Sequence, residues 1–258
     1  MSTIGISANG KTALVTGASR GIGASIARRL AADGFFVWLN HPTEKDSAEP
    51  VVEEIVKSGH RARAIRADLA QVSEIRSMFE VIERESPTLD ALVNNAGICP
   101  FAEWDAITEE VWDRTHNVNL RGAYFCTQLA AKLMVARGAA GRVIAISSIS
   151  AIKGGTVQTH YCPTKAGLTG MMAAFAVCLG PHGITCNSVL PGTIETSMSA
   201  EYLAVAENRQ RLESQTCVGY IGMPGDVAAA VSFLVREEAR YITGCQLLVD
   251  GGEMVKHL

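Results

Sequence analysis

The stretch TGASRGIG, residues 16–23, follows the apolar run Thr12–Thr16 and opens a helical pattern near Ile22–Asp33. Glycines at a strand-to-helix turn let the backbone approach a phosphate closely, while the helix N-terminus supplies free N–H donors and a positive dipole. A glycine turn by itself also occurs as a plain tight turn, so its place in the chain matters. Because this turn is the first strand-to-helix connection, it predicts a dinucleotide site. The expected cofactor contacts in it are Gly17, Ser19, Arg20, Gly21, Ile22 and Gly23.

Beyond this turn, short β-branched runs alternate with helical patterns, which is typical of βαβ units in a parallel sheet. The expected strands are Thr12–Thr16, Phe35–Asn40, Arg61–Ala67, Leu89–Asn94, Gly141–Ser147, Ile184–Leu190 and Gln246–Asp250. The expected helices lie near Ile22–Asp33, Ser47–Ser58, Val72–Glu85, Thr108–Arg137, Tyr161–Gly180 and Asp226–Val235. Right-handed crossovers place helices on both faces of the sheet. The sequence therefore predicts an α/β fold, a Rossmann-like, doubly wound, seven-stranded parallel sheet in a single domain over residues 1–258.

One segment, from Thr193 to Met223, interrupts this alternation with weak periodicity. A long irregular stretch inside a compact domain is typically a lid or a binding loop. A surface helical excursion without a function would give the same pattern. Because the segment follows a predicted strand end, we expect a substrate lid at about 193–223.

The composition is that of an ordinary globular protein, since the 258 residues are 48% apolar and 19% charged and carry a formal net charge of −3. These values exclude disordered and collagen-like classes. Like charges do not form long runs, so binding to nucleic acid or to a membrane is not expected. The most apolar segment, Ala166–Leu179, is shorter than the roughly 20 residues that cross a bilayer, and it predicts a buried helix.

Seven cysteines lie at least eight residues apart without a CxxC pair, so neither a metal site nor a disulfide framework is expected. An odd number of thiols in mostly apolar surroundings is typical of a reducing compartment. Met1–Lys11 lacks the basic and apolar regions of a secretory signal. Together these features predict a cytoplasmic protein without a bound metal.

The charge at the end of the second strand bears on the choice of cofactor. A carboxylate there pairs with a ribose diol and repels a 2′-phosphate. This strand ends at Asn40-His41 without a carboxylate, the nearest acids being Glu44 and Asp46, whereas Arg20 is placed to meet a 2′-phosphate. We therefore expect NADP as the preferred cofactor, with Asn40 among its contacts. NAD is an alternative, because no second arginine stands at 40–43.

Two further strand ends are predicted to contact the cofactor. Asp68-Leu69 follows the third strand, where a carboxylate can accept from an adenine amino group, although an isolated Asp is also a common helix N-cap. Asn95, Ala96 and Gly97 follow the fourth strand, and their small or amide side chains suit close passage of a cofactor. An ordinary Asn-Gly type turn would look similar.

Tyr161 and Lys165 stand four residues apart in a helical segment and therefore share one face. A neighbouring ammonium and a positive nicotinamide lower the pKa of a phenol from its usual value of about 10, which would make Tyr161 a general base. Ser148 closes the fifth strand, where its hydroxyl could bond the substrate oxygen, although a serine there also caps turns. The carboxyl edge of a parallel sheet would bring these residues to the glycine turn.

Ordered motifs over nearly the whole chain make it similar to the short-chain dehydrogenase/reductase family. They are TGASRGIG at 16–23, NNAG at 94–97, Asn119, Ser148, the segment Tyr161–Lys165, PGTIET at 191–196 and VDGG at 249–252. The resemblance implies that Tyr161 is the acid/base, that Ser148 orients the substrate oxygen, and that Lys165 lowers the pKa of Tyr161 and holds the nicotinamide ribose. It also implies that Asn119 keeps a proton-relay water in place and that the protein is a homotetramer built from two long central helices and the C-terminal strand. The remaining cofactor contacts that it implies are Pro191, Gly192, Ile194 and Thr196.

Pro163 departs from the Ala or Ser that the family more often has between its Tyr and Lys. Proline is tolerated in the first turn of a helix, so the helix should begin very near Tyr161. Cys162 is expected to be a packing residue, and His160 is expected to be exposed or to lie at the rim of the pocket.

Within the family, the second half of the chain is most similar to bacterial aldose 1-dehydrogenases of the L-rhamnose and glucose type. The resemblance rests on QTHYCPTKAG at 158–167, LPGTIET at 190–196, GYIG at 219–222 and ARYITG at 239–244. It implies a role in carbohydrate metabolism, in which the anomeric carbon of an aldose is oxidised to the aldonolactone. The expected substrate contacts are Ser148, Ser150, Gln158, Tyr161, Cys99, Phe101 and Thr193.

Ser150 and Gln158 would bond sugar hydroxyls, although ordinary loop residues would look the same. Two alternative functions stay open. One is reduction of a 3-oxoacyl thioester, or of another carbonyl compound, by an enzyme of the same family. The other is a non-catalytic NADP-binding regulator, which the intact Ser148, Tyr161 and Lys165 disfavour.

Overall fold

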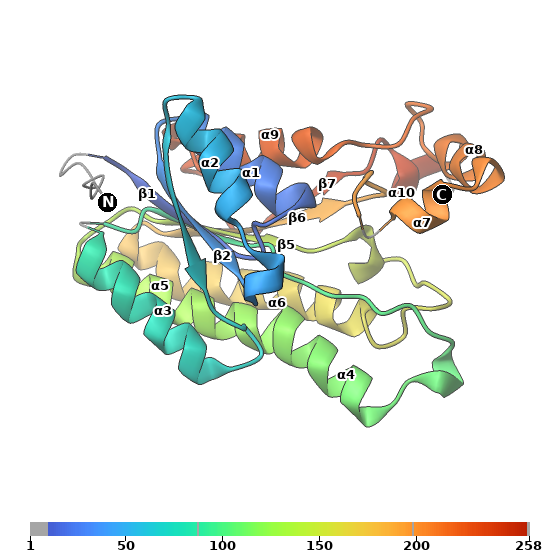
Figure 1. The fold of residues 1–258 in the computed structure, drawn as a ribbon, viewed down its shortest axis with the longest axis horizontal. Coiled ribbons are helices and arrows are strands. Elements are labelled where there is room, and N and C mark those ends of the chain that lie inside the picture. Colours follow the sequence, from blue (N-terminus) through green and yellow to red (C-terminus); the bar gives the residue numbers. More distant parts are fainter. Residues whose placement is uncertain (1–9, 87, 198, 257–258) are drawn as a thin grey trace.

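The computed structural model shows a parallel sheet between two layers of helices (Figure 1). It describes residues 10–86, 88–197 and 199–256. Its seven strands run in the order β3-β2-β1-β4-β5-β6-β7, all parallel. They are β1 (Thr12–Val15), β2 (Phe36–His41), β3 (Arg61–Arg66), β4 (Ala91–Asn94), β5 (Arg142–Ile146), β6 (Thr185–Pro191) and β7 (Gln246–Val249). The predicted doubly wound sheet is confirmed, and the strand ends differ from the prediction by one or two residues.

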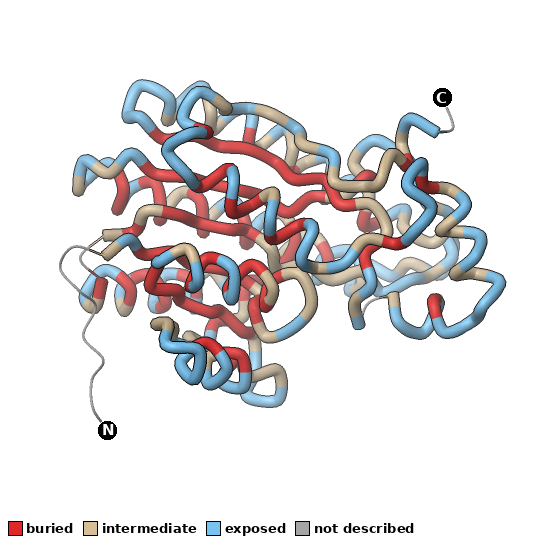
Figure 2. The backbone as a smooth tube through the Cα atoms, turned by 90° about the horizontal axis from the view of Figure 1, so that it is seen from above, coloured by how far each residue is buried: buried red, intermediate tan, exposed pale blue. Residues whose placement is uncertain are grey.

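The helices divide into two layers, each with its own apolar core. The helices α1 (Gly21–Ala32), α2 (Glu49–Lys57) and α9 (Pro224–Leu234) cover one face, and α3 (Val72–Glu85), α5 (Ala123–Ala136) and α6 (Cys162–Leu179) cover the other (Figure 1). The strands β1, β2, β4, β5 and β6 are buried along their whole length (Figure 2). The apolar runs in β1, β2, β4 and β5 are what a strand covered on both faces requires, whereas β6 also buries Thr185, Asn187 and Ser188.

The long helical stretch predicted over Thr108–Arg137 differs from the prediction in its middle. It consists of α4 (Glu109–His116), a π-helical turn over Asn117–Gly122, and α5. Gly122 packs against the loop that follows β3, where a Cβ on Gly122 would be 2.7 Å from the Leu69 carbonyl oxygen. Single π-helical turns often mark functional sites, and this one carries the fully buried Asn119.

The segment 193–223 contains two short helices, α7 (Ala200–Leu203) and α8 (Ala206–Gln215), which the weak periodicity did not reveal. Its two ends meet, because the Gly222 N–H donates to the Thr193 carbonyl at 3.2 Å and the Glu195 N–H donates to the Gly222 carbonyl at 2.9 Å. The C-terminal helix α10 (Glu253–Lys256) lies beside it (Figure 1). Lys256 Nζ donates to the carbonyls of Ser214 and Thr216 at 2.6 and 2.7 Å. The segment is therefore a compact excursion that starts and ends at the carboxyl edge of the sheet.

Candidate active site

The glycine turn packs so tightly that Gly17 and Gly23 leave no room for a Cβ. Gly17 and Gly21 have φ of +60° and +54°, in the left-handed region that favours glycine. A Cβ on Gly17 would lie 2.8 Å from Ala96 Cα, and one on Gly23 would lie 2.3 Å from the Gly17 carbonyl oxygen. The turn leads directly into α1, whose N-cap Arg20 makes no side-chain capping bond. This glycine cradle with free N–H groups at a helix start fits a pyrophosphate.

Thr16, which the sequence reasoning did not single out, holds this turn against the end of β4. Its Oγ1 accepts from the backbone N–H groups of Asn95 and Ala96, both at 3.0 Å. The Asn95 amide donates in return to the Thr16 and Gly17 carbonyls at 2.9 and 3.0 Å. Asn95 therefore shapes the turn through its side chain. A Thr at the end of a predicted strand, directly before a glycine turn, is the signal that could have identified Thr16.

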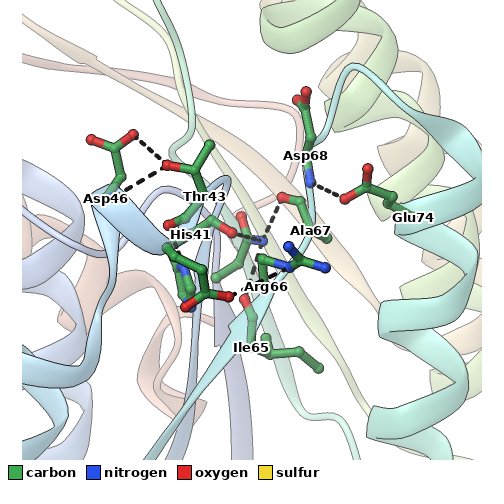
Figure 3. Close-up of polar contacts among 10 residues, drawn as sticks. His41, Thr43, Asp46, Ile65, Arg66, Ala67, Asp68 and Glu74 are labelled. Atoms are coloured by element: carbon green, nitrogen blue, oxygen red, sulfur yellow. Dashed lines mark hydrogen bonds and ion pairs between the residues drawn. The ribbon is translucent and has the colours of Figure 1, made fainter.

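Asn40 and Asp68 lie near the turn, but their side chains have partners within the chain. Asn40 is buried, accepting from the Gly17 N–H at 3.3 Å and donating to the Ala67 carbonyl at 3.0 Å. The Asp68 carboxylate accepts from the Ala70 N–H at 3.0 Å and pairs with Arg114 at 2.8 Å, while its N–H donates to Glu74 (Figure 3). Leu69 beside it is buried. Asn40 thus binds backbone groups that are distant in sequence, whereas Asp68 bonds locally to the Ala70 N–H and pairs with Arg114.

The catalytic residues expected from the sequence come together at the carboxyl end of β5. Ser148 follows that strand, and its hydroxyl forms a hydrogen bond with Tyr161. Tyr161 is the N-cap residue of α6, with Pro163 in the first turn, so the expected helix start is confirmed. Lys165 Nζ is buried, donates to the Ile146 carbonyl at 2.9 Å and lies 5.4 Å from the centre of the Tyr161 ring. A further bond from the Ser147 hydroxyl to the Lys165 carbonyl, at 2.8 Å, ties α6 to β5.

Burial dominates the acid–base properties of this group. It raises the pKa of Tyr161 well above its usual value, and the hydrogen bond with Ser148 offsets only part of that. Burial also lowers the pKa of Lys165 to about 8. Burial thus acts against the lowering that Lys165 and a bound nicotinamide are predicted to cause. The physical reason is that loss of hydration disfavours a phenolate in this position more than the neighbouring groups favour it.

Asn119 connects the π-helical turn to the loop after β4. Its amide donates to the Ile98 carbonyl at 2.9 Å, and its oxygen accepts from the Ile98 N–H at 2.8 Å. The same amide donates to the Thr164 hydroxyl at 3.2 Å, which reaches the first turn of α6. Gly97 lies within this arrangement, where a Cβ would be 3.3 Å from Lys165 Nζ and 3.4 Å from Asn119 Oδ1. Asn119, Gly97 and Lys165 are therefore brought together as expected.

Three of the expected substrate residues form a partly exposed polar group near Tyr161, namely Cys99, Ser150 and Gln158. The Ser150 hydroxyl donates to Gln158 Oε1 at 3.1 Å. Burial raises the pKa of Cys99 to about 12, although a hydrogen bond with Gln158 acts in the other direction. Phe101 is exposed, and Thr193 is half-buried at the start of the 193–223 segment. The Cys99 thiol is thus a neutral polar group, and Ser150 and Gln158 are already oriented toward each other.

His160 differs from the expectation of an exposed or rim position, because it is fully buried directly before Tyr161. Burial lowers its pKa, and the neighbouring His116 lowers it further. A neutral imidazole is the form that such a position favours. Tight packing of the loop before α6 decides this placement, and no local sequence pattern reports it.

Comparisons with known proteins agree on the family and differ on activity. A family description, Enoyl-(Acyl carrier protein) reductase, matches residues 17–253. An L-rhamnose 1-dehydrogenase (NAD(P)(+)) of Azotobacter vinelandii is 45% identical over 248 residues, which are 95% of this chain and 97% of that protein. A 3-oxoacyl-[acyl-carrier-protein] reductase of Staphylococcus aureus is 39% identical over 242 residues, 94% of this chain and 97% of that protein.

Solved structures give the same picture of the fold. A short chain dehydrogenase from Burkholderia cenocepacia J2315, in complex with NADP, superimposes with a TM-score of 0.87 at 38% identity. The match covers 95% of this chain and 98% of that chain. The fold of nearly the whole chain therefore has a counterpart in a known dehydrogenase.

Proposed function

The chain belongs to the short-chain dehydrogenase/reductase family, and we propose that it oxidises the anomeric carbon of an L-rhamnose-like aldose to the aldonolactone. Family membership makes it an NAD(P)-dependent oxidoreductase that acts on CH–OH groups of a small molecule. The observation that carries the choice of an aldose is the 45% identity, over 95% of the chain, to an L-rhamnose 1-dehydrogenase. The Ser150–Gln158 pair beside Tyr161 supports it, because a sugar offers hydroxyls to such groups.

Tyr161 removes the proton of the anomeric hydroxyl, and Ser148 holds the same oxygen through its hydroxyl. When bound, the oxidised nicotinamide would supply the hydride acceptor and a positive charge near the phenol. Lys165, held by the Ile146 carbonyl, donates to the nicotinamide ribose. Asn119 keeps the loop at Ile98 in place and holds a water that passes the proton to solvent.

The cofactor residues divide by the part of NADP that they hold. The residues that would hold the pyrophosphate are Gly17, Ser19, Arg20, Gly21, Ile22 and Gly23. Asp68 and Leu69 would border the adenine, while Asn40 would act through the shape of the glycine turn. The residues that would border the nicotinamide are Asn95, Ala96, Gly97, Pro191, Gly192, Ile194 and Thr196. Thr196 supports this arrangement, because its Cγ2 would lie 3.5 Å from a Cβ on Gly21.

A substrate panel tests the proposed reaction. We expect reduction of NADP with L-rhamnose and with related aldoses, and faster turnover than in the reduction of acetoacetyl thioesters by NADPH. The 39% identity to a 3-oxoacyl-[acyl-carrier-protein] reductase makes thioester reduction the second candidate. Turnover of the thioester with none of the aldoses would establish that alternative.

A variant of the polar pair sharpens this test. Gln158→Leu is expected to raise the KM for the aldose roughly tenfold or more, because a sugar hydroxyl then lacks its partner. Gln128→Leu on α5 is the matched control. An equal effect of both variants would contradict a role of Gln158 in substrate binding.

The segment 193–223 is proposed to be the substrate lid. Support comes from the pairing of its ends at Thr193 and Gly222, and from α8, which buries none of its residues against the sheet. Closure would bring α7 and α8 toward Ser148 and Tyr161. Limited proteolysis within α8 is expected to slow when NADP and the aldose are both present.

We also propose that the protein is a cytoplasmic homotetramer. The helical run Cys162–His182 is 21 residues long and, by length and composition alone, apolar enough to cross a membrane, which differs from the short buried helix expected from the sequence. Only 28% of its most apolar window is buried.

The inner side of this helical run carries Lys165 and packs on the sheet. Along its outer side lies a groove of about 700 Å³, lined by Leu120, Tyr124, Met171 and Phe175, among others. A second copy would cover this surface, and sedimentation without detergent tests it, since a stable monomer contradicts the assembly.

A further inference from the structure

Two arginines, Arg20 in the turn after β1 and Arg66 at the carboxyl end of β3, are each paired with a carboxylate of one short segment. That segment is the 3₁₀ turn Glu44–Asp46, which follows β2. Arg20 in the glycine turn pairs with Asp46 at 2.8 Å, and Arg66 pairs with Glu44 at 3.8 Å. Figure 3 shows Asp46 and Thr43 on one side of this region and Arg66 at the end of β3. The turn therefore places two negative charges where the 2′-position of an adenosine ribose is expected.

The sequence pattern did not predict that Arg66 lies in this region. No arginine stands at 40–43 in the sequence, but Arg66 lies opposite His41 in the register of β2 and β3. Its distance from Glu44 is longer and both side chains are largely exposed. The Arg66–Glu44 pair is accordingly the weaker of the two.

Asp46 is held in its position by more than Arg20. Its Oδ2 accepts from the Thr43 hydroxyl at 3.0 Å, while its own N–H donates to Thr43 Oγ1 at 3.2 Å. The hydrogen bond with Arg20 is the main cause that keeps the pKa of this carboxyl below its usual value, followed by the bond with Thr43. Asp46 thus stays ionised at neutral pH and remains oriented at the Arg20 guanidinium.

We propose that Asp46 sets cofactor selectivity by competing with the 2′-phosphate of NADP for Arg20, so that the enzyme accepts NAD as well. The proposal rests on the proposed function only in requiring a nicotinamide cofactor. A 2′-phosphate carries nearly two negative charges and binds best to an unpaired guanidinium. It must displace Asp46 from Arg20 or share Arg20 with it, and it is repelled by the carboxylate. The ribose diol of NAD carries no charge, so it is not penalised in this way.

The test measures cofactor dissociation constants by calorimetry without any sugar, on the full chain. Asp46→Asn is expected to lower the Kd of NADP roughly five- to tenfold and to leave the Kd of NAD within about twofold. Glu54→Gln is the matched control, because it removes one carboxylate from the similar exposed pair Arg28–Glu54, which joins α1 to α2. Thr43→Ala, which only loosens Asp46, is expected to give a smaller shift of the same sign.

Two further measurements isolate the 2′-phosphate and Arg20. Binding of 2′,5′-ADP should tighten in Asp46→Asn, and binding of 5′-ADP should not. In an Arg20→Ala background, Asp46→Asn should lose most of its effect, as a double-mutant cycle requires for directly coupled groups.

Three outcomes would overturn the proposal. They are an equal NADP Kd in Asp46→Asn and Glu54→Gln, a parallel tightening of NADP and NAD, and a full effect without Arg20. Because binding is measured without substrate, a chain that shows the predicted selectivity shift and oxidises no aldose would refute the proposed substrate alone.

Discussion

The catalytic end and the adenosine end of the proposed cofactor site hold their charged groups in opposite ways. Lys165 is 4% exposed and donates to a backbone carbonyl of β5, and Tyr161 lies buried beside it. At the other end the Arg20 side chain is 64% exposed and pairs with the Asp46 side chain, which is 32% exposed. Buried polar groups with backbone partners have one geometry, whereas exposed ion pairs exchange partners at little cost. The catalytic residues thus lie at a rigid end of the site, whereas the groups proposed to select the cofactor lie at an adjustable end.

The largest expected effect lies at the rigid end. Tyr161→Phe removes the acid/base and should lower turnover by roughly 10²–10⁴-fold while the fold is retained. Tyr241→Phe, at a fully exposed tyrosine, is the control. Unchanged turnover of every accepted substrate in Tyr161→Phe would refute the assigned chemistry. Absence of any turnover in the native chain, with NADP still bound, would favour the non-catalytic regulator.

Lys165→Met tests whether burial of the ammonium costs stability. Because the pKa of Lys165 is lowered to about 8 from 10.5, the folded state holds the proton less well than the unfolded state. The buried ammonium lowers the free energy of unfolding in full below pH 8, and this loss is relieved as the pH rises from 8 toward 10.5. At pH 7 the free energy of unfolding of the variant should therefore exceed that of the native chain by up to about 3 kcal/mol, minus the contribution of the lost hydrogen bond to Ile146. Urea titration measures this difference. Turnover of the variant should collapse.

The pH dependence distinguishes this cost from a simple packing effect. The stability advantage of Lys165→Met over the native chain should shrink between pH 8 and pH 10. Lys57→Met, at an exposed lysine of α2, should show neither the gain nor the trend. An advantage that is the same at both pH values would argue against a buried ammonium.

Two threonines of one strand region allow a smaller, matched comparison. Thr16→Val leaves the Asn95 and Ala96 N–H groups without their acceptor and should lower the free energy of unfolding by about 2 kcal/mol. The Thr12 hydroxyl is buried and has no partner among the described residues, so Thr12→Val should be neutral or slightly stabilising. Urea titrations of both variants test this. Equal losses would contradict the role given to Thr16.

The smallest effect is expected at the adjustable end. Asp46→Asn should change the free energy of unfolding by less than about 1 kcal/mol, even though it shifts cofactor selectivity, because exposed ion pairs contribute little to stability. Thermal unfolding without cofactor measures it. A large destabilisation would mean that the Glu44–Asp46 turn is part of the rigid framework, and the contrast between the two ends would fail.

Much of the fold could be predicted because its signals are local. The strand positions follow from short apolar runs that are buried on both faces, and Pro163 correctly predicted that α6 begins beside Tyr161. The π-helical turn at Asn117–Gly122 was not predictable in this way, since a change of hydrogen-bond register by one residue barely alters the apolar period. The helices α7 and α8 were missed for a related reason, because they are short, and α8 buries no apolar face.

The amino-acid sequence by itself determined the doubly wound sheet, the glycine turn and the residues Ser148, Tyr161 and Lys165 with their order along it. Periodicity, glycine conformation and helix spacing are properties of neighbouring residues, and they need no tertiary information. Only the tertiary structure decided that Asn40 binds distant backbone groups, that Asp68 pairs with Arg114, that His160 is buried, and that Asp46 pairs with Arg20. Hydration, burial and charge pairing depend on groups far apart in the chain, so the pKa of Tyr161 and the partner of Arg20 emerge only when the strand ends meet.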